Sequence, residues 1–129
     1  MKTESALCYW IIEDDTDMQY LVQMKFGVDL RTRFCGAATN SIDAIELLRG
    51  KETGVVVLDH FIEGQIMGLQ LAPLIKAAAP NVRIILLTSH DLAFEVSREP
   101  AIDAYLRKNE LAKLLPPALQ LMGLEPGGK

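Results

Sequence analysis

Short, continuous apolar runs alternate along the chain with segments in which apolar residues recur at helical spacing. Continuous apolar runs are typical of parallel strands buried on both faces, and recurrence every three or four residues is typical of amphipathic helices. The runs predict five strands, at residues 7–12, 33–37, 54–58, 82–87 and 103–106. A helix is predicted after each strand, and Pro116-Pro117 should break the last one into a turn at 109–114 and a helix from about Pro116.

Polar residues and glycines mark where these helices begin and end. The sequence Thr16-Asp17-Met18-Gln19 matches a capping box, and apolar residues follow it at helical spacing, which predicts the first helix: Met18, Leu21, Val22 and Phe26. Three residues can cap the second helix, which should stop near Gly50: Thr39, Asn40 and Ser41. Three residues are predicted on its inner face: Ile42, Ile45 and Leu48. The third and fourth helices are predicted at 66–79 and 91–97, the fourth being short.

Five strand–helix units predict an α/β fold with one doubly wound parallel sheet, helices on both faces and right-handed crossovers. The first and third strands are the two continuous apolar runs that lead directly into acids, so they should be neighbours at the centre. The strand order 2-1-3-4-5 meets this requirement, which is a flavodoxin-like three-layer αβα arrangement. We expect a single domain over 1–129, with its core at about 7–122 and a tail at 123–129.

Reactive polar residues follow four of the predicted strands. They are Glu13-Asp14-Asp15 after the first strand, Asp59 after the third, Thr88 after the fourth and Lys108 just past the fifth. Parallel strands end at one edge of the sheet, where open α/β sheets build their sites, so these side chains should emerge together. A carboxylate cluster, a hydroxyl and an ammonium at one edge indicate magnesium-assisted phosphoryl transfer.

The acids at this edge would repel one another, and a bound divalent cation would relieve the repulsion. Oxygen ligands favour hard ions such as Mg²⁺ or Mn²⁺ over zinc. Asp59 could then attack phosphorus as a nucleophile, while Thr88 and Lys108 hold the remaining phosphoryl oxygens. The alternatives are ordinary ones: a solvated acidic turn, a strand-terminating aspartate, a β-branched strand end and a surface lysine.

Composition narrows the class of protein. The chain has 129 residues, of which half are hydrophobic, so it should fold around a real core. Its formal net charge is −4 and its basic residues are scattered, so we expect no direct nucleic-acid partner. The apolar start is too short for a signal peptide or a membrane span, so we expect a cytoplasmic protein with no membrane partner. Cys8 and Cys35 are expected to be buried, reduced thiols.

The segments at 10–15, 55–59, 84–88 and 103–108 together closely resemble the receiver domain of two-component response regulators, over about 7–122. The resemblance implies that Asp59 is the phosphoacceptor, served by a sensor histidine kinase or a phosphotransfer protein. It implies that Glu13, Asp14, Asp59 and the backbone carbonyl of Phe61 bind Mg²⁺ or Mn²⁺. Thr88 and Lys108 would contact the phosphoryl group, and Thr88 and Tyr105 would form the switch. The resemblance further implies a downstream protein target, a phosphorylation-dependent dimer and no conventional turnover enzyme.

Asn109 stands where the family often has a proline, so we expect either a cis Lys108–Asn109 peptide or a rearranged loop. His60 should be structural, whereas the resemblance implies that Phe61 and His90 occupy family positions that can influence dephosphorylation. The chain is expected to be a stand-alone switch or a receiver excised from a larger protein. Two other functions remain open: a haloacid-dehalogenase-type phosphatase that uses Asp15, and a degenerate receiver that only binds proteins.

Overall fold

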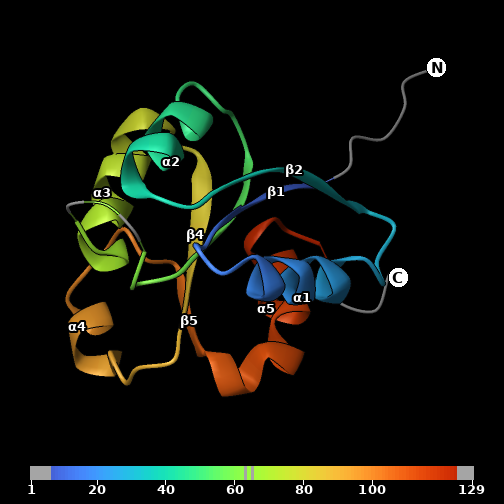
Figure 1. Ribbon diagram of the computed structural model, residues 1–129. Coiled ribbons are helices and arrows are strands. Elements are labelled where there is room, and N and C mark those ends of the chain that lie inside the picture. Colours follow the sequence, from blue (N-terminus) through green and yellow to red (C-terminus); the bar gives the residue numbers. More distant parts are fainter. Residues whose placement is uncertain (1–6, 63, 65, 125–129) are drawn as a thin grey trace.

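The computed structural model describes residues 7–62, 64 and 66–124, and it contains the predicted parallel sheet in the predicted order, β2-β1-β3-β4-β5 (Figure 1). The strands are β1 Leu7–Ile12, β2 Thr32–Ala38, β3 Gly54–Leu58, β4 Val82–Thr88 and β5 Ala104–Arg107. The helices are α1 Thr16–Phe26, α2 Ser41–Leu48, α3 Gly68–Ala78, α4 Ala93–Ser97, the 3₁₀ helix η1 Lys108–Lys113 and α5 Leu115–Leu121. The flavodoxin-like fold class predicted from the sequence is confirmed.

The sheet separates two apolar cores, because alternate residues of each strand face opposite sides. On β1, Trp10 and Ile12 pack with side chains of α2 and α3, whereas Tyr9 and Ile11 pack with those of α1 and α5. Every residue of β3 is buried, as expected for the central strand. Each fully buried Val, Leu or Ile contributes roughly 1.5–3 kcal/mol, so these two layers fix the ends of β1 and β3 firmly in place.

The structure corrects the Thr16 cap read from the capping box and the inner-face position of Ile42, whereas Asn40 is one of the three predicted caps of the second helix. Asp15, not Thr16, caps α1, and its side chain accepts a hydrogen bond from the backbone N–H of Asp17. Asn40 caps α2, and this start turns Ser41, Ala44 and Leu48 toward the core. Ile42 was predicted on the inner face but is 70% exposed, because the cap sets the phase of the helix.

The two cysteines are joined by a disulfide, which corrects the expectation of reduced thiols. The parallel register pairs Tyr9 with Phe34 but Trp10 with Gly36, so Cys35 is an extra residue in β2. This β-bulge brings the Cα atoms of Cys8 and Cys35 within 5.7 Å of each other across neighbouring strands. The sequence pattern does not show bulges, and the proximity of the two thiols therefore could not be predicted.

The last helices are irregular, as predicted: the helix after β5 is divided in two, and the helix before it is short. The described part of the chain has no cis peptide bond, so the rearranged loop is the correct alternative at Lys108–Asn109. That loop is η1, and its start is tied by the Glu110 carboxylate, which accepts from the backbone N–H of Arg107. Pro116 lies in the first turn of α5, where a missing N–H costs nothing. The helix α4 is short, at five residues.

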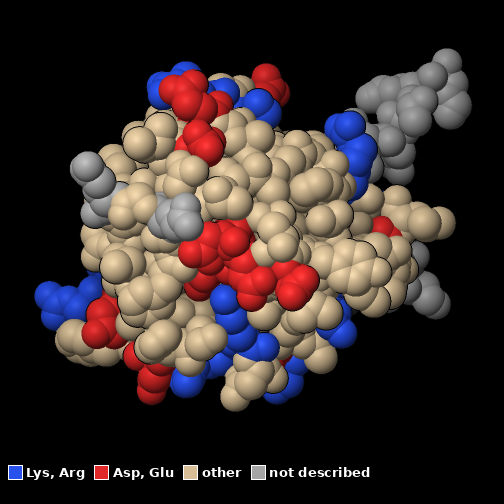
Figure 2. All heavy atoms as spheres, in the orientation of Figure 1, with Lys and Arg blue, Asp and Glu red and all other residues tan. Residues whose placement is uncertain are grey.

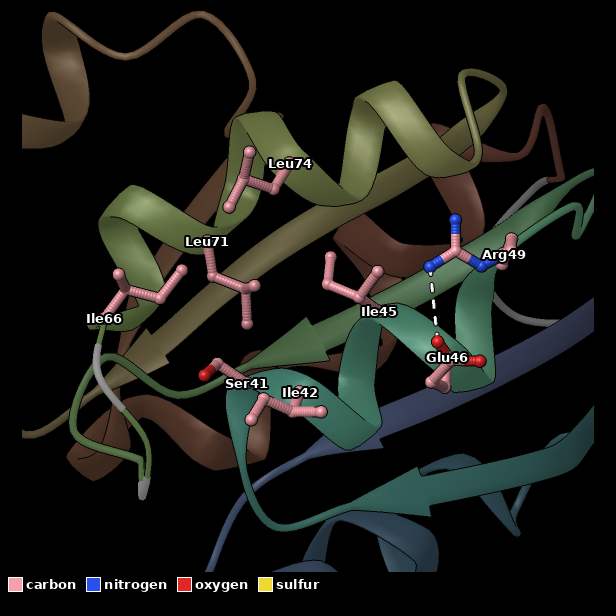
Figure 3. Close-up of a pocket in the computed structure, with 8 residues that line it drawn as sticks. All are labelled: Ser41, Ile42, Ile45, Glu46, Arg49, Ile66, Leu71 and Leu74. Atoms are coloured by element: carbon pink, nitrogen blue, oxygen red, sulfur yellow. Dashed lines mark hydrogen bonds and ion pairs between the residues drawn. The ribbon is translucent and has the colours of Figure 1, made fainter.

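A shallow apolar cavity of about 310 Å³ lies between α2 and α3 (Figure 3). It is lined by Ser41, Ile42, Ile45, Glu46, Arg49, Ile66, Leu71 and Leu74. Ile42, which was wrongly predicted on the inner face of α2, lines its rim, and the Arg49–Glu46 ion pair lies at one end.

Candidate functional site

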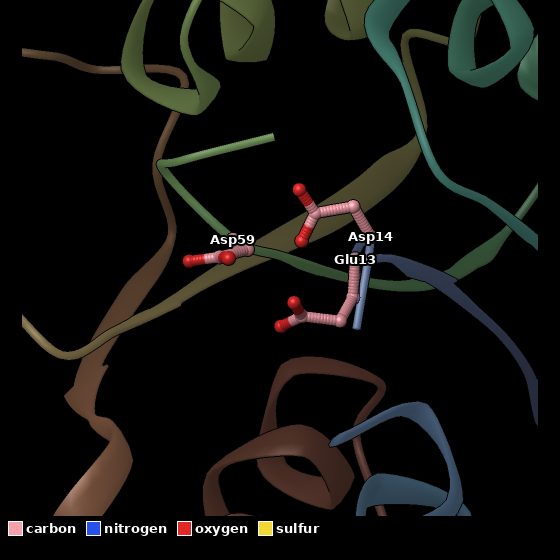
Figure 4. Close-up of side chains that lie close together, drawn as sticks. All are labelled: Glu13, Asp14 and Asp59. Carbon is pink, nitrogen blue, oxygen red and sulfur yellow. The ribbon is translucent and has the colours of Figure 1, made fainter. Parts of the chain in front are cut away.

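The acids after β1 and β3 meet at the carboxyl edge of the sheet (Figure 4). Ile12 pairs with Leu58 in the parallel register, and the backbone N–H of Asp59 donates to the carbonyl of Ile12 over 3.0 Å. Carboxylate oxygens of Glu13, Asp14 and Asp59 consequently lie within 4.8 Å of one another. Glu13 and Asp59 are buried, whereas Asp14 is exposed, so the cluster opens to solvent on one side. Figure 2 shows acidic residues gathered at the centre of this face.

Lys108 reaches this cluster from the start of η1. Its ammonium Nζ lies 3.0 Å from Oε1 of Glu13 and 3.3 Å from Oδ2 of Asp59. In Figure 2 basic side chains lie directly beside the central acidic group. One ammonium therefore contacts two of the three carboxylates, and the exposed carboxylate of Asp14 adds a further negative charge, which suits the site to a cation.

The ionisation of Glu13 is strongly perturbed. Burial raises the pKa of the Glu13 carboxyl, and the charge of Asp59 raises it further. The contacts with Lys108 and with the N–H of Asp15 offset this only in part, so the pKa rises from 4.5 to about 7. Burial alone would lower the pKa of Lys108, but its contacts with Glu13 and Asp59 outweigh burial and raise it. Lys108 is therefore a permanent cation at neutral pH.

The chain after Asp59 is held against α3. Oδ1 of Asp59 accepts from the N–H of His60 over 2.7 Å, and the carbonyl of His60 accepts from the N–H of Gly68 over 2.7 Å. The N–H of Leu69 donates to Nδ1 of His60 over 3.2 Å. Burial lowers the pKa of His60, which keeps the ring neutral and able to accept this bond. The structure thus gives His60 the structural role predicted from the sequence.

Gly68 explains how closely α3 approaches the strand end. A Cβ atom at this position would lie 2.1 Å from the backbone oxygen of Asp59 and 2.8 Å from Cα of His60. Only glycine allows the first turn of α3 to pack on the backbone that carries Asp59. Sequence reasoning missed the role of this residue, because a glycine required by close packing looks the same in the sequence as a glycine in an ordinary turn.

Thr88 is the last residue of β4, and Tyr105 lies within the neighbouring strand β5. Thr88 is fully buried, and its Oγ1 accepts from the N–H of His90 over 3.3 Å. The Tyr105 hydroxyl accepts from the N–H of Leu92 over 2.8 Å and donates to the carbonyl of His90 over 3.0 Å. Both side chains therefore bind the loop that connects β4 to α4.

Phe61 stands beside this loop. Its ring lies 4.7 Å from that of His60 and 4.4 Å from that of His90, measured between centroids, and it is 43% exposed. The ring is therefore a partial cover beside the strand end that carries Asp59. A metal contact through the Phe61 carbonyl stays a prediction. Asp15, the other acid of the triplet, is occupied as the cap of α1.

These geometries agree with the protein family that the sequence matches. The family model for the response regulator receiver domain matches residues 10–118. Because this match covers most of the chain, the chain belongs to the response regulator receiver domain family. No curated protein matches the chain in sequence.

Solved structures of response regulators share the fold. The RcsB response regulator of Salmonella typhimurium superposes with a TM-score of 0.81 at 20% identity, over 95% of this chain and 63% of that chain. The response regulator domain of Thermotoga maritima CheB gives a TM-score of 0.74 at 18% identity, over 94% of this chain and 99% of that chain. A LuxR-family DNA-binding response regulator from Staphylococcus aureus gives 0.72 at 21% identity, over 89% and 98%.

This chain spans under two thirds of the RcsB chain, and identities this low show a shared fold only. No helix in the described part of the chain has the length and apolar character needed to cross a membrane.

Proposed function

We propose that this receiver domain, with its core at about 7–122, is a phosphorylation-dependent switch in which Asp59 is the phosphoacceptor. The observation that carries the proposal is the contact of the Lys108 ammonium with both Asp59 and Glu13 beside the exposed carboxylate of Asp14. An ammonium and an open acid cluster are the two groups that a bound phosphoryl group and its counter-ion need. The phosphodonor would be a sensor histidine kinase or a phosphotransfer protein.

The acid cluster fits a hard divalent cation. Glu13, Asp14 and Asp59 offer only oxygen atoms, from three carboxylates whose oxygens lie within 4.8 Å of one another, and oxygen ligands suit Mg²⁺ or Mn²⁺. The backbone carbonyl of Phe61 would be the fourth protein ligand. When bound, the ion offsets negative charge on the phosphoryl oxygens.

In the proposed step a carboxylate oxygen of Asp59 forms a bond to the phosphorus of a phosphohistidine. The phosphorus–nitrogen bond breaks, and the imidazole of the donor leaves with the electron pair and takes a proton from solvent. Lys108 would move from the free carboxylate to a phosphoryl oxygen, and the Thr88 hydroxyl would donate to another. Because Thr88 already holds His90, its rotation would release that N–H, and Tyr105 would move with the loop.

The output would be a changed surface around α4 and β5 that a downstream protein target reads, with a phosphorylation-dependent dimer as one form of it. A cytoplasmic location and a protein partner, rather than nucleic acid bound directly by this chain, belong to the same proposal. The phosphatase alternative is not favoured, because the residue it needs, Asp15, caps α1.

Intact-mass measurement after incubation with acetyl phosphate and Mg²⁺ tests the proposal. We expect one added phosphoryl group on the wild type and none on Asp59→Asn, with Asp15→Asn as a matched control that retains the adduct. Turnover of acetyl phosphate without an adduct, lost in Asp15→Asn, would establish the phosphatase instead. Absence of any reaction in the wild type would leave a protein-binding module.

A further inference from the structure

The loop between β4 and α4 is held from β5 by two side chains that donate to successive carbonyls. Arg107 donates from its terminal nitrogen to the carbonyl of Ser89 over 3.1 Å, and Tyr105 donates to the carbonyl of His90 over 3.0 Å. Tyr105 and Arg107 are two residues apart in a strand, so their side chains leave the same face of the sheet. The residue that follows, Lys108, reaches the acid cluster instead.

The position of Arg107 in the sheet makes it a neighbour of the proposed switch hydroxyl. The parallel register pairs Arg107 with Thr88, so the side chain of Arg107 begins beside the last residue of β4, after which the loop follows. Its backbone is fixed as well, because its N–H donates to the Glu110 carboxylate over 3.0 Å. Arg107 therefore spans from a fixed strand end to the first carbonyl after Thr88.

The guanidinium of Arg107 binds a neutral group, the backbone carbonyl of Ser89. Its Nε atom is buried and has no hydrogen-bond partner among the described residues, while its terminal nitrogen binds the Ser89 carbonyl. A guanidinium carries five donors in a planar fork, so the contact with Ser89 uses only part of the hydrogen-bonding capacity of Arg107.

We propose that Arg107 is a positioning residue for the phosphoryl-binding side of the site. It holds Ser89 while Tyr105 holds His90, and together they fix the loop so that the Thr88 hydroxyl can meet a phosphoryl group on Asp59. The proposal rests on the proposed function. It separates two halves of the site: the acids come from β1 and β3 and do not depend on Arg107, whereas the phosphoryl contacts come from β4 and its loop.

Binding of beryllofluoride, a mimic of the phosphoryl group, should reveal this separation. We expect Arg107→Gln to lower beryllofluoride affinity in the presence of Mg²⁺ by about tenfold, because the loop loses the charge-assisted hydrogen bond that holds Ser89. Mg²⁺ affinity, measured alone, should stay within about twofold of wild type, since additivity holds for groups that share no partner. Arg107→Lys, which keeps the charge but loses the fork, should recover part of the affinity.

Two further variants make the test specific. Arg49→Gln removes an exposed arginine from α2 and should leave both affinities unchanged. The double variant Arg107→Gln/Tyr105→Phe should lose less affinity than the product of the two single losses, because both residues hold one loop.

Wild-type beryllofluoride affinity in both Arg107→Gln and Arg107→Lys would overturn the proposal and leave the proposed function intact. Equal losses of Mg²⁺ and beryllofluoride affinity would also overturn it, because they indicate general damage to the site. A wild type that binds no beryllofluoride and accepts no phosphoryl group would instead sink the proposed function, and this inference with it.

Discussion

Glu13 is the residue whose surroundings set the pH response of the site. It is only 3% exposed, lies beside Asp59 and contacts Lys108, and its Oε2 accepts from the N–H of Asp15 over 3.1 Å. Burial first, and then the charge of Asp59, bring its pKa up to about 7. A proton on Glu13 therefore competes with a cation for the same oxygens near neutral pH.

The affinity for Mg²⁺ should rise steeply across this pH range. Below the raised pKa Glu13 is protonated and neutral, and above it the carboxylate is free to bind, so binding strengthens as pH increases. With a pKa of about 7, the ionised fraction changes about tenfold between pH 6 and pH 8, and the Mg²⁺ dissociation constant should fall by a similar factor. Titration calorimetry at several pH values would measure it.

The variant Glu13→Gln provides the control for this pH dependence. It keeps the size of the side chain and one acceptor oxygen but cannot titrate, so Mg²⁺ should bind more weakly at pH 8 and with a flatter pH profile. A wild-type profile that is flat from pH 6 to pH 8, or a Glu13→Gln profile as steep as that of wild type, would contradict the assignment.

Single residues at the sheet edge differ in how far the sequence reveals them. The three acids of the cluster directly follow uninterrupted apolar strands: Glu13, Asp14 and Asp59. Packing does not explain a charged residue at such a strand end, so their proximity could be predicted. The contact between Arg107 and Ser89 could not, because it depends on which rotamer reaches which carbonyl across two strands. Patterns of hydrophobicity place the ends of strands but do not place the tips of long side chains.

At the scale of elements, the first turn of α3 fixes where Asp59 stands. The N–H groups of Gly68 and Leu69 donate to His60, so the helix start and the strand end form one unit. The sequence predicted this helix from residue 66, two residues early, because apolar residues continue upstream of its true start. Its start is set by a tertiary contact with the backbone of Asp59, which periodicity does not contain.

The variant Gly68→Ala should push the first turn of α3 away from the strand end that carries Asp59. Its Cβ would lie 2.1 Å from the carbonyl oxygen of Asp59, so α3 or the strand end must shift. We expect a loss of about 1–3 kcal/mol in the free energy of unfolding, measured by urea denaturation, together with slower phosphorylation of Asp59.

Gly27→Ala is the matched control for this substitution. Gly27 has a right-handed helical backbone, and a Cβ there would be 3.2 Å from its nearest neighbour, the carbonyl oxygen of Gln23. Its unfolding free energy should stay within about 1 kcal/mol of wild type. Equal effects of the two substitutions would show that close approach to Asp59 is not what Gly68 provides.

For the whole molecule, the disulfide is the feature that the sequence misled us about most. Both cysteines lie in apolar strand-like runs, from which we expected buried, reduced thiols, whereas the structure leaves both only partly buried. The bulge at Cys35 changes the outcome, because it places the two cysteines side by side on neighbouring strands at the β2 edge of the sheet. Disulfides are rare in reducing compartments, so a cytoplasmic location would keep this bond under attack by cellular thiols.

Opening the disulfide should destabilise the fold without dismantling the site. The bond closes a loop between residues 27 positions apart, and restricting a loop of that length in the unfolded chain is worth about 3–4 kcal/mol. Urea denaturation with and without dithiothreitol should show that difference for wild type, while Cys8→Ala/Cys35→Ala should match reduced wild type and ignore the reductant. An identical urea midpoint for oxidised and reduced wild type would contradict the stabilising role. Because Glu13 and Asp59 are held by both apolar cores, the reduced protein should still accept a phosphoryl group at temperatures where it remains folded.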